Sequence, residues 1–254
     1  MERILTFEDL LNEEDYIICD TGACSIPKSD WYNEGICQAR NLSGIDTSIV
    51  SREIELLSSY IEFLSNEKVY VTCGVLQEMK NLDEAIGYSR RFFDLKERRQ
   101  KNRHGDFDDN SKELLETMHE LAHGVYKEAR RSVFQPEQKE RYSHLENIVI
   151  DTTQKTGAKV DFSILYRDKK RTGREDTHAD EQLAATALYL SSVAERKCGI
   201  ITSDSDIRRI LVYSLKDPRL ANISDLVGKN RIRIYKPEDI ATIRLDFDTL
   251  GFKL

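Results

Sequence analysis

Short apolar runs alternate with longer stretches of helical periodicity along this chain. The runs 16–19, 69–72 and 199–202 are short and continuously apolar, which is typical of strands buried on both faces of a parallel sheet. A fourth run, 231–235, alternates apolar and polar residues as a half-exposed strand does. Because helical segments separate these runs, the pattern predicts an α/β fold with a central parallel sheet flanked by helices.

Apolar residues recur at helical spacing in the intervening segments. The predicted helices cover 1–13, 51–66, a segment from 74, 114–129, 136–151, a segment from 180, a segment from 207, and a closing helix at 237–243. Val160 to Tyr166 could be a strand or a loop edge. We expect a single domain over 1–254, within which 97–155 forms an additional helical insertion.

Composition sets limits on the class of protein. The chain is 39% hydrophobic and 33% charged, with a net charge of −7, which indicates a soluble globular protein and argues against one that coats nucleic acid through its overall field. No apolar run approaches the roughly 20 residues that span a bilayer. The five cysteines form no CxxC pair, and Cys19, Cys73 and Cys198 are expected to be small apolar residues of a reducing compartment. We expect a cytoplasmic location.

Carboxylates follow the predicted strands. Asp20 stands at the end of the first run, Glu78 lies shortly after the second, and Asp204 and Asp206 follow the third, while Asp180 opens the helix before that third strand. The carboxyl ends of parallel strands are where open α/β sheets place their ligands. Acids that converge there repel one another, and a hard cation such as Mg²⁺ or Mn²⁺ relieves that repulsion through oxygen ligands. The alternative is that these acids are helix caps and solvated loop residues.

The same residues carry a resemblance to a known family. The segments IICDTGAC, VTCGVLQEM, DEQLAATALYL and GIITSDSDI resemble the four motifs of the PIN domain family, in the family's order. The resemblance covers roughly 14–82 and 156–213. It implies a PIN-like α/β fold and a metal-dependent endoribonuclease that hydrolyses RNA phosphodiester bonds, with Asp20, Glu78, Asp180 and Asp204 as catalytic and metal-binding residues.

The resemblance also assigns supporting roles. Asp206 would be an auxiliary metal-binding acid, and the polar residues that would orient ligands are Thr21, Thr202 and Ser203. Two departures stand out: Gly22 replaces the Asn or Ser often found after Asp-Thr, and 97–155 has no counterpart in small toxin-type members. The second departure argues against a toxin and favours a specialised member, in which the insertion could mediate homo-oligomer formation or contact a protein partner.

Basic residues lie close to the predicted acids in the sequence. The candidates for RNA binding are Lys169, Lys170, Arg171, Arg174, Arg208 and Arg209. If they flank the crevice, they could contact the phosphates on either side of the scissile bond of a single-stranded or structured RNA. A solvated loop and helix face is the alternative.

Two other functions are open. His119-Glu120-Leu121-Ala122-His123 matches HExxH, in which two histidines on one helix face bind Zn²⁺. A zinc peptidase would need a third ligand, for instance His144, and both histidines are predicted off the apolar stripe, which favours a solvated pair. A catalytically silent PIN-like scaffold that binds RNA or protein is the other alternative.

Overall fold

The structure, a computed structural model, describes residues 5–21, 47–80, 109–158, 177–193, 196–202, 204–223, 231–236 and 240–241. Its main sheet has four parallel strands in the order β3-β2-β4-β5. Their bounds are Tyr16–Cys19 for β2, Val69–Tyr70 for β3, Cys198–Ile201 for β4 and Ile232–Tyr235 for β5. The predicted α/β class with a parallel central sheet is confirmed.

The position of β2 and β4 in the centre of the sheet explains why their residues are apolar. Ile17, Ile18 and Ile200 are fully buried, because helices cover both faces of β2 and β4 and leave no position for a polar side chain. The edge strand β5 is different: its residues are half-buried or exposed, which accounts for the alternation in 231–235. Residues 73–80, directly after β3, are helical as predicted.

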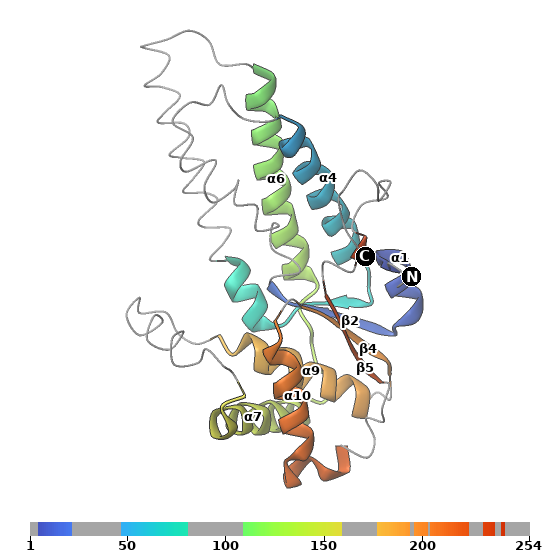
Figure 1. The fold of residues 1–254 in the computed structure, drawn as a ribbon, viewed down its shortest axis with the longest axis vertical. Helices are drawn as coiled ribbons and strands as arrows, with labels where there is room; N and C mark the ends of the chain where they lie inside the picture. The colour runs from blue at the N-terminus through green and yellow to red at the C-terminus, as the bar shows by residue number, and fades with distance from the viewer. Residues whose placement is uncertain are drawn as a thin grey trace, which may run out of the picture.

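Helices form a layer on each side of the sheet (Figure 1). The first layer contains α1 (Phe7–Glu13), α4 (Thr47–Leu64) and α6 (Asp109–Arg131), and the second contains α7 (Lys139–Thr156), α9 (Ala179–Val193) and α10 (Asp206–Lys216). In the second layer α9 packs directly on β2, β4 and β5. Every residue from Leu183 to Ser192 is buried, and three alanines among them, Ala184, Ala185 and Ala187, keep this helix close to the strands.

Residues expected as an insertion supply two of these helices. Within the first layer α6 lies alongside α4, and in the second α7 packs on α9 and α10. Between them, Val133 forms a parallel bridge with Val71, in which Val71 N–H donates to Ser132 and Phe134 N–H donates to Val71. The chain therefore reaches the sheet edge beyond β3. That 97–155 is inserted relative to other proteins stays a prediction.

The two ends of the chain differ from the prediction. The helix predicted over 1–13 is present as α1, but it begins only at Phe7, where Thr6 and Asp9 make a reciprocal capping box, and Leu5–Thr6 form strand β1. The closing helix over 237–243 is contradicted by strand β6 (Ile240–Ala241), which pairs in parallel with β1. Backbone pairing between segments so distant in sequence leaves no signal in local periodicity.

The remaining expectations have mixed outcomes. Cys19 and Cys198 are buried free thiols as predicted, whereas Cys73 is exposed at the start of the 73–80 helix. The segment 160–166, expected as either a strand or a loop edge, lies outside the described residues. Among the helices that the structure describes, none is long and apolar enough to cross a membrane.

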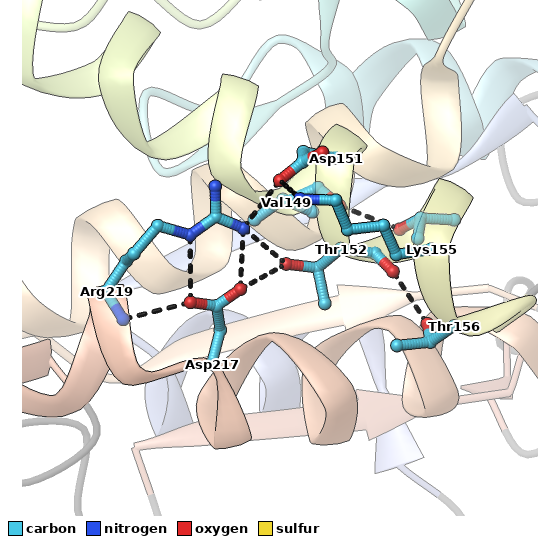
Figure 2. Close-up of polar contacts among 8 residues, drawn as sticks. Val149, Asp151, Thr152, Lys155, Thr156, Asp217 and Arg219 are labelled. Carbon is cyan, nitrogen blue, oxygen red and sulfur yellow. Dashed lines mark hydrogen bonds and ion pairs between the residues drawn. The ribbon is translucent and has the colours of Figure 1, made fainter.

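A polar network fastens α7 to the turn that follows α10 (Figure 2). The guanidinium Nη2 of Arg219 lies 2.6 Å from Asp217 Oδ2 and 2.7 Å from Asp151 Oδ2. The hydrogen bonds from Arg219 hold the pKa of the Asp217 carboxyl well below its usual range. The buried Thr152 hydroxyl donates to Asp217 Oδ2 at 2.9 Å, so a side chain inside α7 is tied to the 3-10 turn Pro218–Leu220.

We expect Thr152→Val to lower the free energy of unfolding by about 1–2 kcal/mol, because it removes a buried hydrogen bond to a charged acceptor without changing side-chain size. Thr156→Val is the matched control. Thr156 lies one turn further along α7, is exposed, and donates only to the Thr152 carbonyl, so both variants carry the same change in helix propensity. Urea unfolding of the two proteins measures the difference, and equal stability would contradict a role for the network.

Candidate active site at the carboxyl ends of the strands

Asp20 is held at the carboxyl end of a central strand. It follows β2 directly, and its backbone N–H donates to the Ile201 carbonyl of β4 at 3.0 Å. Register aligns Cys19 with Ile201, so the next residues along the two parallel strands, Asp20 and Thr202, lie side by side. Asp20 is only 8% exposed. The sheet thus holds a buried carboxylate at the carboxyl ends of its strands, where α/β proteins bind ligands.

The buried Thr202 hydroxyl connects the ends of the two strands. It donates to Asp20 Oδ2 at 2.7 Å and accepts from the Asp204 backbone N–H at 2.9 Å. Thr202 is 1% exposed, and its own N–H donates to Tyr235 of β5. Thr202 therefore lies beside the acids, and its role in orienting metal ligands stays a prediction.

Threonines also position Glu78, which the helix at 73–80 carries to the same edge. Thr21 donates its hydroxyl to Glu78 Oε2 at 2.6 Å and its backbone N–H to Asp20 Oδ1 at 2.6 Å. The second oxygen, Glu78 Oε1, accepts from the Thr177 hydroxyl at 2.8 Å. Thr21 therefore bonds both Asp20 and Glu78, and Glu78 is held from two segments of the chain.

Asp180 completes the group that the fold brings together. It lies in the first turn of α9, three residues after the Thr177 that holds Glu78. Burial raises the pKa of Asp20 to about 6, the charges of Asp180 and Glu78 act in the same direction, and the hydrogen bonds from Thr202 and Thr21 oppose it. The repulsion shows that three acids from separate elements share one electrostatic environment.

The last two predicted acids lie where α10 begins: Asp204 is in the turn after β4, and Asp206 is the first residue of the helix. Asp204 is exposed and its Oδ1 accepts from the Asp206 backbone N–H at 2.7 Å, so this carboxylate bonds the backbone at the start of the helix. Asp206 lies 3.2 Å from Arg209 through its Oδ1. The Asp204 backbone N–H donates to the Thr202 hydroxyl, which in turn donates to the buried Asp20. Ser203, the third expected supporting residue, lies outside the described residues.

Residues that sequence reasoning missed bring the Glu78 helix against the start of α9. A Cβ on Gly74 would lie 2.7 Å from both the Ala179 Cα and the Thr177 carbonyl oxygen, so only glycine permits this approach. Gly74 N–H donates to Gln182 Oε1 at 2.7 Å. His178, between Thr177 and Asp180, has a left-handed φ of 49°, a strained conformation of the kind that clusters at functional sites. Gly74 and Gln182 fall within the quoted motifs, but nothing in the sequence signals their contact.

The donor chemistry fits a hard divalent cation. Asp20, Glu78 and Asp180 offer carboxylate oxygens, threonine hydroxyls hold those carboxylates, and no thiol or imidazole is needed, which is the ligand chemistry that Mg²⁺ and Mn²⁺ prefer. These carboxylates do not converge on one point. Among the residues that the structure describes, no group of three or more His, Cys, Asp or Glu side chains is placed to hold a metal ion.

The predicted basic residues divide into two sets. Arg208 and Arg209 are exposed on α10, next to the acidic turn. The other four, Lys169, Lys170, Arg171 and Arg174, lie outside the described residues. The histidines of the HExxH match lie on α6, where Ala122, Val125 and Ala129 form the buried side. His123 is exposed, as is His144 on α7, and the His119 side chain is outside the part of the chain that the structure describes.

Comparison of the chain with protein-family models, with curated proteins and with solved structures gives no match in any of the three. The family resemblance therefore rests on the four motifs alone, and the functional argument rests on the geometry of the residues that they contain.

Gly74→Ala tests the close approach of the Glu78 helix to α9. The added methyl group meets backbone atoms that cannot rotate away, so we expect a loss of about 1–3 kcal/mol in the free energy of unfolding. Gly124→Ala is the control, because its Cβ would meet Ile61 Cδ1 at 2.9 Å, the far end of a flexible side chain. Urea unfolding of both variants measures the difference. A Gly74→Ala protein as stable as Gly124→Ala would show that the contact is not needed.

Asp20→Asn should remove a pH dependence of stability in the presence of EDTA. The pKa of Asp20 is about 6 in the folded state against its ordinary value of 3.8, so between these values the folded protein binds more protons than the unfolded chain. The contribution of the protonated carboxyl is therefore complete below about pH 4 and is lost as the pH rises through about 6. At about pH 8 the variant should be more stable than wild type by roughly 3 kcal/mol, and near pH 4 the two should agree. A difference that does not change with pH in urea unfolding would contradict the shift.

Proposed function

We propose that the protein is a metal-dependent endoribonuclease that hydrolyses RNA phosphodiester bonds at the carboxyl edge of its parallel sheet. The observation that supports this most strongly is the buried Asp20, whose pKa is raised by burial and by the charges of Asp180 and Glu78. Confining charge in this way destabilises the folded protein, and a cation that binds all three acids would offset that cost. A purely structural role would be served as well by neutral residues.

The order of the hydrogen bonds supports the same function. Thr202 connects Asp204 with Asp20, Thr21 connects Asp20 with Glu78, and Thr177 connects Glu78 with the start of α9. Each hydroxyl orients a carboxylate oxygen while leaving lone pairs on that oxygen for a further partner. This arrangement resembles the way in which outer residues orient the ligands of metal sites.

In this proposal Asp20, Glu78, Asp180 and Asp204 hold Mg²⁺ or Mn²⁺, and Asp206 is an auxiliary acid. Such an ion would polarise a water molecule and offset the negative charge that develops on the phosphate. The threonines keep the carboxylates in place, and Arg208 and Arg209 are positioned near the acidic turn to contact the phosphate chain. No protein nucleophile takes part.

The resemblance of the four motifs to PIN domains favours RNA hydrolysis over other reactions of metal-bound phosphates. The silent scaffold would not need its acids, whereas here threonine hydroxyls hold the carboxylates of Asp20 and Glu78 in place. The zinc peptidase would need His119 and His123 together with a third ligand, and no observation among the described residues favours it. A cytoplasmic location and contacts of the helical insertion with a partner stay predictions.

Cleavage of a labelled single-stranded RNA with Mg²⁺, Mn²⁺, Zn²⁺ or EDTA tests the proposal. We expect cleavage with Mg²⁺ or Mn²⁺ that EDTA abolishes, and a loss of more than about 100-fold in Asp20→Asn and in Asp204→Asn, because each removes a charged ligand. The control is Asp15→Asn, an exposed acid before the amino end of the same strand, β2, whose carboxylate accepts from Lys197.

A second readout separates the metal site from the reaction. Mn²⁺ should raise the melting temperature of the wild-type and Asp15→Asn proteins and leave that of Asp20→Asn unchanged. Retained cleavage in both site variants would rule out this site. Cleavage by none of the proteins, without any shift by Mn²⁺, would instead favour the silent scaffold.

A further inference from the structure

The solvent-facing side of α10 carries a continuous row of basic and aromatic side chains. We call this row the α10 stripe; it consists of Ser205, Arg208, Arg209, Val212, Tyr213 and Lys216. These positions recur every three to four residues and so share one face of the helix. The opposite face is buried and packs on α7 and α9 (Figure 1). The stripe is therefore not required for the packing of the core.

The stripe is hollowed and presents apolar surface. Its residues line an open hollow of about 430 Å³. Tyr213 is 41% exposed and Val212 is 42% exposed, which makes them two of the three large hydrophobic side chains that are exposed in the described part of the chain. The Lys216 ammonium lies over the Tyr213 ring, 5.7 Å from its centroid. An aromatic ring thus lies in the open beside a cation.

The stripe begins at the candidate active site. Ser205 lies between Asp204 and Asp206 in the turn after β4, and Lys216 is eleven residues further on, about 16 Å along the helix axis. The Arg209 guanidinium lies 3.2 Å from Asp206 Oδ1, so it offsets the negative charge of Asp206 at the start of the stripe. Arg208 and Lys216 add positive charge further along a protein whose net charge is −7.

We infer that the α10 stripe binds the segment of a single-stranded RNA that leaves the active site, with one base stacked on Tyr213 and the adjoining phosphates held by Arg208 and Lys216. This inference rests on the proposed nuclease function and adds the strand type and the path of the substrate. Proteins bind single-stranded nucleic acids with positive side chains beside an exposed aromatic ring. The ring stacks on the face of an unpaired base, and the cations contact the phosphates. A duplex offers no such face, since its bases are stacked on each other.

The test measures binding of a fluorescent single-stranded RNA to the full chain in EDTA, where no cleavage occurs. Tyr213→Ala should weaken binding roughly fivefold or more, because stacking is lost, and Tyr213→Phe, which keeps the ring, should stay within about twofold of wild type. Arg208→Gln and Lys216→Gln should each weaken binding and reduce the salt dependence, log Kobs against log salt, by about 0.7. Lys127→Gln, the same charge change at an exposed position on α6, should change neither.

The outcomes distinguish this inference from the nuclease proposal. If wild type cleaves RNA and the stripe variants bind it as wild type does, the stripe is not the path and the nuclease stands. If the variants lose binding as expected while wild type cleaves nothing with any metal, the stripe binds RNA and the nuclease proposal fails. A duplex of the same sequence that competes as well as the single strand would overturn the strand assignment. Equal competition by polyglutamate would overturn RNA as the occupant and assign the stripe to an acidic protein.

Discussion

The candidate site depends on the parallel pairing of β2 with β4. This pairing aligns the two strand ends, so that Asp20 and Thr202 leave the sheet side by side and the Thr202 hydroxyl donates to the buried carboxylate. Two further acids are connected to this pair: Glu78 through Thr21, and Asp204 through Thr202. A shift of one residue in the register would place Asp20 on the opposite face from Thr202 and break the hydrogen bond between them.

Burial of the Asp20 carboxylate lowers the stability of the folded protein. The carboxylate loses hydration and lies close to two other acids, and both effects raise its pKa. Hydrogen bonds from Thr202 and the Thr21 backbone offset part of it. Natural proteins keep such destabilising groups where they bind or react, which is why a strongly perturbed acid in a buried position indicates a functional site.

The layer of α7, α9 and α10 has a buried inner side and an outer side to which we assign RNA binding. Its inner residues fill the core against the sheet, and the network of Asp151, Thr152, Asp217 and Arg219 holds α7 to the turn after α10. Because α10 begins at the acidic turn and is anchored at its far end, its outer face has a fixed orientation relative to the site. A rigid helix is a more accurate support for a ligand path than a loop.

The sequence by itself determined the α/β class of the fold and the position of Asp20 at the end of a strand. Short, continuously apolar runs are typical of strands buried on both sides. An acid directly after such a run lies where the strand ends, so the position of Asp20 followed from local pattern. Tertiary structure decided what depends on contacts between distant segments. Examples are the pairing of β1 with β6, the approach of Gly74 to Ala179, and the hydrogen bond from Thr177 to Glu78. Periodicity reports only which face of an element is buried and not which residue of another element lies against it, so these contacts left no local signal.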